Sequence, residues 1–463
     1  RLSTHVLVLA AGQGKRMMSD LPKVAHLAAG RPLVNWVLDS LAPLAPASTV
    51  VVVGHGADHV RRTLPAGTTT ALQERQLGTG HAARVGLDAI KGLAGDDVVM
   101  ILYGDVPLLT SGLIEELASL GVEESARLVV AVMDDPTGYG RIIRDVEGRV
   151  TGVVEERDCT PDQRSIKEVN AGIYAVRAGL LVGALGQVTD DNHQAEFYLT
   201  DVIGILAGTG DRLTAVEASS QEVQGINSQD QLASAQRELQ RRVNQRLMES
   251  GVWMLDPERT YIDDTVEVAP GARIYPGVHL EGSTTVGPDA RVGPDVFAKD
   301  SSIGAGSTVW YAVLRSAVVG DECEVGPFAS LRPGTVLARG AKAGTFVETK
   351  NTTLGEGAKA PHLSYLGDAT IGAGTNIGAG AITCNYDGFE KHHTEIGEDV
   401  FIGSDTMLVA PVSIGDGAVT GAGSVITEDV PAGSLAVERA EQREIPGYSE
   451  RRKAERAALD AED

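Results

Sequence analysis

The chain has 463 residues, enough for two or three domains with well-filled cores. Its 63 acidic residues outnumber its 40 lysines and arginines, and the net charge of −23 argues against nucleic acid or an anionic membrane as a partner. The apolar runs are only as long as strands, so we expect no membrane span and no signal peptide. The cysteines are few, far apart and without metal-ligand spacing, which favours a reduced, cytoplasmic protein.

Apolar strands alternate with helical stretches along the first half of the chain. The apolar run Val6–Leu9 leads directly into the sequence AAGQGKRM. A strand, a glycine-rich turn and basic residues in this order favour a phosphate-binding loop, although Gly-x-Gly alone also fits an ordinary tight turn. The alternation predicts a parallel, doubly wound sheet whose ligand lies beyond the carboxyl ends of the strands. Further strands are expected at 49–53, 98–102, 128–133 and 172–176, with a helix at 32–44.

One such strand end carries the sequence Tyr103-Gly104-Asp105. A carboxylate at this place suits Mg²⁺, a hard cation that prefers carboxylate and phosphate oxygens. Taken alone, Asp105 is better explained as a helix cap or a turn residue.

A series of motifs supports the functional interpretation of the first half. They are Leu9-x-x-Gly12-x-Gly14-x-Arg16-Met17, Pro22-Lys23, Gln73, Leu77-Gly-Thr-Gly-His81, Tyr103-Gly-Asp105, Gly138-Tyr-Gly-Arg141, Val154-Glu155, Asn170-Ala-Gly172 and Gly225-Ile-Asn227. Together they resemble the sugar-1-phosphate nucleotidyltransferases. The resemblance implies a Rossmann-like fold and nucleotidyl transfer to a sugar phosphate with release of pyrophosphate.

The resemblance also implies a role for individual residues. Asp105 and Asn227 would hold Mg²⁺, while Arg16 and Lys23 would face the triphosphate and the transferred phosphorus. Lys15 stands where the family usually has threonine, so it is left unassigned. The base and its surroundings would be contacted by Gln73, Gly78 and Thr79, the sugar by Gly140, Glu155 and Asn170, and the nucleotide further by Leu9, Ala10, Ala11, Gly12, Tyr103 and Gly104.

No general base is expected in this half. A sugar phosphate is already ionised at neutral pH and is itself the nucleophile. Transfer then depends on positioning and on neutralisation of charge.

An amphipathic helix is predicted where the first half ends. Residues 229–250 place Leu232, Ala235, Leu239, Val243 and Leu247 on one stripe, with Ser228 as a possible cap and Gly251 as a stop. The stripe is too short for a coiled coil. We therefore expect a first domain at 1–227 and a linker helix at 228–250.

The second half is dominated by an aliphatic-Gly pair that returns every six residues, with occasional five-residue steps, from about Ile262 to Ile426. Such a period indicates a solenoid, with one short strand per repeat and three repeats per triangular coil. About nine coils stacked at ~4.8 Å are expected. We expect each glycine to relieve strain at a corner by adopting positive φ. The pairs begin at Val286, Val292, Ile303, Val319, Val325, Leu354, Leu366, Ile371, Ile377, Ile396, Ile402 and Ile414.

Departures from this repeat mark the candidate site of the second half. In the six-residue register Ala360 and Leu366 point inward, so His362 projects outward. The rhythm also breaks after Ile382, where residues 383–394 form a loop, and extruded loops commonly carry sites. A lone surface histidine is usually only solvated, but imidazole is the usual general base near neutrality, and acyl transfer to an amine needs such a base.

A second set of motifs gives this region a function. They are Arg332-Pro-Gly334, Phe346-Val-Glu-x-Lys350, His362-Leu-x-Tyr365-Leu-Gly-Asp368, Asn376-Ile-Gly-Ala379-Gly, Asn385-Tyr-Asp-Gly388-x-x-Lys391-x-x-Thr394, Gly403-Ser-Asp405 and Ala436-x-x-Arg439-x-x-Gln442. With the first set they resemble, over nearly the whole chain, the bifunctional bacterial enzymes that make UDP-N-acetylglucosamine. The resemblance implies a left-handed parallel β-helix at 251–447, a homotrimer, and acetyl-CoA bound between neighbouring subunits.

By the same resemblance His362 would be the base of acetyl transfer, with Glu348 near it. Glucosamine-1-phosphate would be bound by Arg332, Lys350, Tyr365 and Asn376. Acetyl-CoA or the acetyl group would be contacted by Ala379, Asn385, Tyr386, Ser404, Ala422 and Arg439.

The sequence thus predicts an enzyme that acetylates glucosamine-1-phosphate with its second half and transfers UMP from UTP to the product with its first. One alternative is a nucleotidyltransferase whose β-helix is only regulatory; the intact His362 and Asn385-Tyr386 groups oppose it. The other is a non-catalytic assembly subunit, opposed by Gly14, Arg16, Lys23 and Asp105. The charged tail 448–463 lacks an apolar stripe long enough for a stable helix, and we expect partial disorder there.

Overall fold

The computed structural model describes residues 3–459, which form two compact units. The first contains the chain up to Arg246 together with Ile262–Thr265, and the second contains Leu247–Tyr261 and the chain from Val266 onward. Most of the helix that the sequence analysis assigns to a separate linker therefore belongs to the first unit. No helix in the described range is long and apolar enough to cross a membrane.

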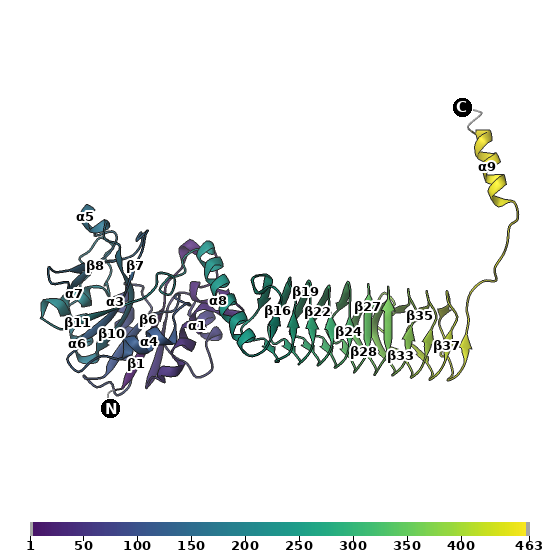
Figure 1. Ribbon diagram of the computed structural model, residues 1–463, viewed down its shortest axis with the longest axis horizontal. Helices are drawn as coiled ribbons and strands as arrows, with labels where there is room; N and C mark the ends of the chain where they lie inside the picture. Colours follow the sequence, from purple (N-terminus) through teal and green to yellow (C-terminus); the bar gives the residue numbers. More distant parts are fainter. Residues whose placement is uncertain (1–2, 460–463) are drawn as a thin grey trace. The chain divides into compact units, whose positions relative to one another are not determined.

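A seven-strand path forms the centre of the first unit, in the order β11-β7-β10-β6-β1-β4-β5 (Figure 1). The short strands β8 and β9 pair beside β10, and β2 pairs with β3 in a separate ribbon. The strands are β1 Thr4–Ala10, β2 Leu27–Ala28, β3 Arg31–Pro32, β4 Ser48–Val53, β5 Thr69–Leu72, β6 Val98–Tyr103, β7 Ala126–Val132, β8 Arg141–Arg144, β9 Val150–Val154, β10 Glu168–Arg177 and β11 Leu213–Glu217.

The prediction of a parallel sheet is wrong at β10 and at the β8–β9 hairpin beside it, whose pairings are antiparallel. β10 runs antiparallel to both of its neighbours, β6 and β7. The start of β10, Glu168, pairs with the end of β7, Val132. The connection between them holds only the β8–β9 hairpin and a short helix, so the chain never crosses back over the sheet as a parallel neighbour requires.

Helices cover both faces of this sheet, as the alternating pattern predicts, and buried side chains form one core on each face. The helix expected at 32–44 is split into α1 and the 3-10 turn η3, where Pro43 interrupts the helical bonding. The helices are α1 Leu33–Ser40, α2 Ala57–Thr63, α3 Thr79–Asp88, α4 Ser111–Ala118, α5 Pro161–Arg164, α6 Ala178–Leu185, α7 Asp201–Gly208 and α8 Gln229–Glu249; the 3-10 turns are η1 Lys15–Met17, η2 Lys23–Ala25 and η3 Ala42–Leu44.

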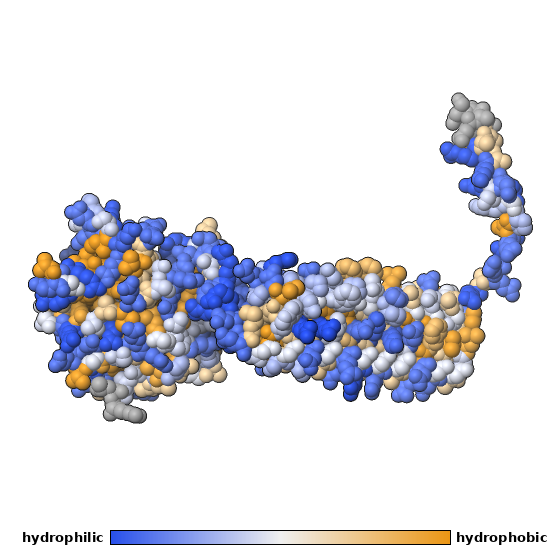
Figure 2. Space-filling model, viewed as in Figure 1, coloured by the Kyte–Doolittle hydropathy of each residue, from blue (hydrophilic) through white to orange (hydrophobic). Residues whose placement is uncertain are grey.

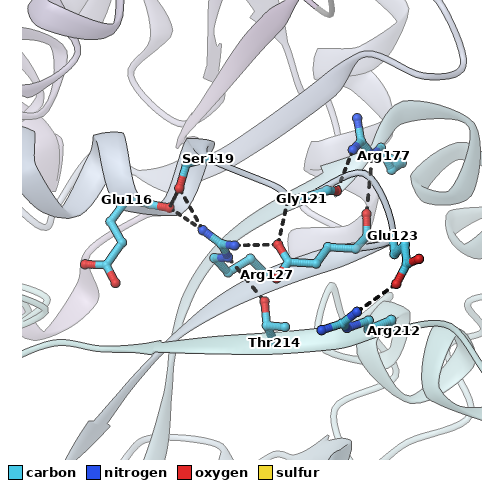
Figure 3. A network of polar contacts seen from close by, with 9 residues as sticks. Glu116, Ser119, Gly121, Glu123, Arg127, Arg177, Arg212 and Thr214 are labelled. Carbon is cyan, nitrogen blue, oxygen red and sulfur yellow. Dashed lines mark hydrogen bonds and ion pairs between the residues drawn. The ribbon is translucent and has the colours of Figure 1, made fainter.

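The amino-terminal end of β7 is tied to neighbouring segments by charged side chains (Figure 3). Arg127 donates to the Ser119 hydroxyl at 2.9 Å and to the Thr214 hydroxyl on β11 at 3.2 Å, and it pairs with Glu124. Burial raises the pKa of Glu124, but the Gly121 amide and the Arg127 guanidinium outweigh this effect and leave the pKa lowered. The network stabilises the end of the sheet at which the parallel strands begin, opposite their carboxyl ends.

Helix α8 has the amphipathic character that the sequence predicts. Ala235, Leu239 and Val243 are at most 1% exposed, and Leu247 is 7% exposed. Polar contacts add to this packing, because Gln240 donates to the backbone oxygen of Ile262 at 2.9 Å, and Arg242 donates to that of Leu108 at 2.9 Å.

The second unit is a parallel β-helix, with one side formed by every second or third strand in sequence (Figure 1). Within the described range this side contains eleven strands, from β12 to β39, so the solenoid is longer than the predicted nine coils. Most paired positions on successive coils lie 16 to 18 residues apart, as Arg291 with Thr308 and Glu324 with Lys342, but the distance along the chain is 25 residues where the loop 383–394 is inserted, as for Asn376 with Phe401. The inward aliphatic residues are buried as predicted, including Ala360 and Leu366 at 0% exposure.

The strands of this unit are short because each spans one side of a coil. They are β12 Trp253–Met254, β13 Thr260–Ile262, β14 Glu267–Val268, β15 Arg273–Ile274, β16 Val278–Glu281, β17 Thr285–Val286, β18 Arg291–Val292, β19 Val296–Lys299, β20 Ser302–Ile303, β21 Thr308–Val309, β22 Ala312–Arg315, β23 Val318–Val319, β24 Glu324–Val325, β25 Ala329–Leu331, β26 Val336–Leu337, β27 Lys342–Thr345, β28 Glu348–Leu354, β29 Lys359–His362, β30 Tyr365–Ile371, β31 Asn376–Ile377, β32 Ile382–Cys384, β33 Thr394–Ile396, β34 Phe401–Ile402, β35 Met407–Val409, β36 Val412–Ile414, β37 Val419–Thr420, β38 Val425–Ile426 and β39 Leu435–Ala436, with the 3-10 turn η4 at Pro257–Arg259.

The glycines of the aliphatic-Gly pairs serve a different purpose from the one expected. Among them only Gly293 and Gly326 adopt positive φ. Elsewhere the neighbouring coil leaves no room for a side chain: a Cβ on Gly304 would lie 2.4 Å from the carbonyl carbon of Gly320, and one on Gly372 would lie 2.3 Å from the oxygen of Gly397. Close approach of the coils explains these glycines, and backbone strain does not.

The tail contradicts the expectation of no stable helix. Residues Tyr448–Leu459 form helix α9, which buries none of its side chains. Arg452 and Glu455 are three residues apart, which places them on one face of the helix, and they form an ion pair at 3.3 Å. A search for an apolar stripe does not detect this kind of helix stabilisation. Residues 460–463 of the predicted tail lie outside the described range.

Candidate active sites

The loop after β1 is shaped by two glycines with different surroundings. Gly14 has φ +64°, and a Cβ there would lie 2.8 Å from the Cβ of Lys23, so the loop can pass over Lys23 only with glycine. A Cβ on Gly12 would meet nothing within 4 Å. Gly12 instead lines a cavity of about 500 Å³ with Leu9, Ala10 and Ala11. Its exposed backbone can approach an anion closely, as the sequence predicts.

Three predicted site residues from distant parts of the chain meet at this cavity. The Lys23 ammonium pairs with the Asp105 carboxylate and donates to the Asn227 amide oxygen at 3.0 Å. Asp105 follows β6, whose register with β1 brings Tyr103 beside Leu9. The Asp105 backbone oxygen also accepts from Ile226, 2.9 Å away, which anchors the segment that carries Asn227. A cation is thus already held between the two predicted metal ligands.

The opposite part of the cavity is lined by Gln73, Gly78 and Thr79. Gln73 is 3% exposed, and its amide nitrogen donates to the Gly78 oxygen at 3.1 Å. The Thr79 hydroxyl accepts from the Leu199 amide at 3.1 Å. Burial raises the pKa of Tyr103, which also lines the cavity, so its hydroxyl remains protonated at neutral pH.

The predicted sugar-binding residues gather between β8, β9 and β10. The Asn170 amide group donates to the Tyr174 hydroxyl at 2.6 Å, and the backbone amide of Asn170 donates to the Gly140 oxygen at 2.8 Å. A Cβ on Gly140 would lie 3.7 Å from a Glu155 carboxylate oxygen. Burial raises the pKa of Glu155, although a hydrogen bond from the Thr200 hydroxyl at 3.0 Å opposes the shift.

Arg16 has a different setting from the other predicted residues of this half. It lies on η1 and is exposed. It is close enough to Tyr139 to lower the pKa of that phenol, although burial dominates and the net pKa of Tyr139 is raised. The side chain is therefore at the rim of the site.

Two glutamines of this cavity were missed by the sequence analysis. Gln13 donates to Gln76 at 2.9 Å, and Gln76 donates to the Ala11 oxygen at 3.3 Å. Both line the cavity. The signal was present, because Gln13 stands between the two loop glycines and Gln76 directly precedes the Leu77-Gly motif.

On the β-helix, one corner collects the predicted acetyl-CoA residues. Hydrogen bonds run along it from coil to coil: Gly380 donates to the Leu363 oxygen at 2.9 Å, Asp405 to the Ala379 oxygen at 2.7 Å, and Gly423 to the Ser404 oxygen at 2.8 Å. Arg439 ends the row by donating to the Ala422 oxygen at 2.5 Å. Thus His362, Ala379, Ser404 and Ala422 occupy one corner of successive coils, and His362 is exposed as predicted. This arrangement defines the His362 corner.

A second corner, defined by Lys350, Asp368 and Asn385, holds the remaining polar residues. Asp368 accepts from the Asn385 amide group at 2.6 Å. The predicted loop lies between β32 and β33, and an antiparallel bridge joins Tyr386 to Lys391 within it. The close ammonium of Lys391 lowers the pKa of Lys350, and Arg332 adds to this effect. Lys391 is thus a cation of this site that sequence reasoning left unassigned, although its motif contained it.

The two corners are separated within one chain. Residues 364–368 run from one to the other, and four strand steps span about 13 Å. Tyr365 starts this strand, and its hydroxyl lies 3.5 Å from the Asn385 amide nitrogen. Asn376 lies on the next coil of the side that carries β29. Glu348 pairs with Arg332 at 2.8 Å.

Metal binding can be judged from the donor atoms. Within the described range no group of three or more His, Cys, Asp and Glu side chains is placed to hold a metal. Asp105 and Asn227 nevertheless present hard oxygen donors toward one point. Mg²⁺ commonly takes one or two protein oxygens and completes its shell with water and phosphate, so these two residues fit it.

Comparisons with known proteins match different parts of the chain to two family models. Residues 6–177 match the model of the MobA-like NTP transferase domain, and residues 393–428 match the bacterial transferase hexapeptide, a family of six repeats. The chain is 49% identical to the Bifunctional protein GlmU of Streptomyces avermitilis, over 98% of this chain and 96% of the relative. It is 47% identical to that of Stutzerimonas stutzeri (96% and 99% covered) and 44% identical to that of Caldanaerobacter subterraneus (96% and 97% covered). The chain therefore belongs to the GlmU family of bifunctional proteins.

Proposed function

We propose that the protein makes UDP-N-acetylglucosamine in two steps at two separate sites. The second unit acetylates glucosamine-1-phosphate with acetyl-CoA, and the first unit transfers UMP from UTP to the product and releases pyrophosphate. The observation that carries this proposal is the presence, in one chain, of the Lys23–Asp105–Asn227 cluster and the His362 corner. A regulatory β-helix needs no outward base, and an assembly subunit needs no cluster of this kind.

In the first unit the chain's own groups bind and orient both substrates. The backbone around Gly12 receives the phosphates, Gln73 reads the uracil, and Glu155, Asn170 and Gly140 hold the sugar. Lys23 and Arg16 neutralise the triphosphate, with Lys23 inside the cavity and Arg16 at its rim. Because the attacking phosphate is already ionised, alignment and charge neutralisation suffice.

Asp105 and Asn227 would hold Mg²⁺ in this unit. When bound, the metal supplies neutralisation of phosphate charge as a Lewis acid. The Lys23 ammonium, which bonds both residues, would then be free to turn to the phosphates beside them.

In the second unit His362 takes one proton from the sugar ammonium group, and the free amine attacks the thioester carbonyl. The C–S bond breaks as the amide forms, and CoA leaves as its thiol with the second proton from the amine. The Lys350, Lys391 and Arg332 cations supply charge for the sugar phosphate, while Tyr365 and Asn376 orient the sugar. The row along the His362 corner follows the coil axis and suits an extended ligand, so acetyl-CoA lies along Ala379, Ser404 and Ala422. Asn385 and Tyr386 contact the acetyl end from the loop.

We further propose that this site is assembled between copies in a homotrimer. The two corners of one chain lie about 13 Å apart, which favours contributions from neighbouring chains. On the coils that precede His362 in the chain, the same corner is apolar and exposed. The ring centroids of Phe328 and Phe346 lie 5.4 Å apart in a stacked pair, and those of Tyr311 and Phe328 lie 5.5 Å apart. Figure 2 shows apolar side chains at several places on the visible surface of this unit. An exposed aromatic row of this kind favours burial against another copy.

The proposal includes a cytoplasmic location, supported by three cysteines that are all unpaired in the structure. Product analysis tests the function as a whole. Glucosamine-1-phosphate, acetyl-CoA, UTP and Mg²⁺ with the full chain should yield UDP-N-acetylglucosamine by mass spectrometry. Formation of UDP-glucosamine without acetylated product would leave only the nucleotidyltransferase alternative.

A further inference from the structure

The side chain of Gln73 is held by two groups that both face its amide nitrogen. Gln73 follows β5 and lines the nucleotide cavity. Its Nε2 atom lies 3.1 Å from the Gly78 oxygen and 2.9 Å from Nδ1 of His81. A backbone carbonyl can only accept a hydrogen bond, so the amide nitrogen must point this way.

This orientation fixes the state of the histidine. Nδ1 of His81 accepts the second amide hydrogen of Gln73, and the neutral ring carries its own hydrogen on Nε2. The Gln73 oxygen is turned away from both groups, and, with the side chain of Lys15 left aside, no residue in the range 3–459 donates a hydrogen bond to it. It is left as an acceptor for a ligand in the cavity that the residue lines.

The loop that carries these groups is fixed by its surroundings. Gly78 has φ +105°, and a Cβ there would lie 2.6 Å from the oxygen of Phe197. Gly80 donates to that oxygen at 2.8 Å, and Phe197 donates to the Leu77 oxygen at 2.8 Å. His81 stands in the first turn of α3, so its ring is presented from a rigid start of the helix. Because these groups are already held in place, a single side-chain hydrogen bond can distinguish one bound base from another.

We propose that His81 is a positioning residue that sets the base specificity of nucleotidyl transfer by holding the Gln73 oxygen toward the nucleotide. Uracil presents an N–H at ring position N3, which the Gln73 oxygen accepts. Cytosine presents a lone pair at the same position, which that oxygen repels. Without the His81 acceptor the amide turns more freely, and the preference for UTP over CTP falls. The inference rests on the proposed uridylyl transfer in the first unit.

The test compares two substitutions of nearly equal size. His81→Asn places an amide oxygen close to the position of Nδ1, whereas His81→Leu places a methyl group there. The values of kcat/KM for UTP and CTP are measured by pyrophosphate release with N-acetylglucosamine-1-phosphate as acceptor. His81→Leu should lower the UTP-to-CTP ratio by about 3- to 10-fold, the worth of one neutral hydrogen bond, and His81→Asn should restore most of it. His59→Leu, on α2 outside the cavity lining, should leave the ratio unchanged.

A purely structural role for His81 gives a different pattern. The rates with UTP and CTP would then fall together in His81→Leu, and an unchanged ratio overturns the proposal. If His81→Leu does not fold, His81→Phe removes the same acceptor while keeping a ring, and its ratio decides by the same criterion. Failure of the function itself is recognised separately, because the unaltered protein would then release no pyrophosphate from UTP.

Discussion

The Lys23 ammonium lies 3.0 Å from the Asn227 amide oxygen, although 204 residues separate the two along the chain. The same ammonium pairs with Asp105, so three groups from three segments meet at one edge of the sheet. An ammonium and a metal ion compete for these oxygens. The contact therefore ties the proposed metal site to the proposed phosphate contact in a single cluster.

Replacing Asp105 tests this cluster. Asp105→Ala should lower the rate of uridylyl transfer at least about a hundredfold, the loss typical of removing one electrostatic group that stabilises a transition state. Acetyl transfer should not change, because Asp105 belongs to the first unit. Both rates are measured on the full chain, with Asp88→Ala, an exposed carboxylate on α3, as the matched control. Normal turnover of UTP by Asp105→Ala would exclude the residue from the site.

The buried setting of Glu155 predicts a pH-dependent effect on stability. Its pKa is raised by burial, so folding disfavours the charged carboxylate. The stability it contributes is present below its unfolded pKa and is lost as the pH rises through the folded value. Glu155→Gln removes that charge but keeps an oxygen for the Thr200 hydroxyl. The midpoint of thermal unfolding of Glu155→Gln minus that of the unaltered protein should therefore be larger at pH 7.5 than at pH 4.

Calorimetry of the full chain measures this difference, and the relevant transition is the one that UTP and Mg²⁺ shift upward. Glu115→Gln, an exposed carboxylate, serves as the control and should show no such pH dependence. In activity, Glu155→Gln should lose about 10- to 100-fold in kcat/KM for the sugar phosphate, as expected for a hydrogen bond to a charged group. A difference in midpoint that is the same at both pH values would show that burial of the charge has no effect on stability.

Much of this molecule could be predicted from its sequence, and the failures have physical causes. The strand that contains Val6–Leu9, the stripe of α8 and the solenoid period depend on local spacing, which a sequence displays directly. The direction of β10 depends on how its connection runs in space. The need for glycine at position 304 depends on how closely the next coil approaches. Neither is a local property.

The site shows the same division. The residues of the Lys23–Asp105–Asn227 cluster were found through motifs, but that Lys23 bonds both others follows only from the fold. Likewise the ion pair of Glu348 with Arg332 follows only from the fold, because both side chains project from the same face on adjacent coils. Lys391 was overlooked because its importance arises from proximity to Lys350 across the loop.

Acetyl transfer should depend on His362. His362→Ala should lower its rate by about 10²–10⁴ at neutral pH, the usual contribution of a positioned general base. Higher pH should partly rescue the variant, since free amine accumulates without help from the protein. Rates are compared across pH with uridylyl transfer from pre-acetylated substrate as the internal control, and with His279→Ala as a second histidine of the same unit. Equal acetylation rates in variant and unaltered protein would remove His362 from the mechanism.

The β-helix should fold without the first unit. A fragment from Gly251 onward retains nearly all of the second unit, and a solenoid is stabilised mainly by contacts between neighbouring coils. It should be trimeric and should acetylate glucosamine-1-phosphate at the rate of the full chain. Sedimentation and a thiol-release assay measure both properties. A monomeric, inactive but folded fragment would contradict the proposed assembly of the site.

The central claim is that two independent sites act in sequence through a released intermediate, and mixing two variants tests it most directly. Asp105→Ala alone, given glucosamine-1-phosphate, acetyl-CoA, UTP and Mg²⁺, should accumulate N-acetylglucosamine-1-phosphate. His362→Ala alone should leave glucosamine-1-phosphate largely unconverted. The mixture should form UDP-N-acetylglucosamine, as measured by chromatography of the products. A mixture that forms no more of this product than the two variants do separately would contradict the account.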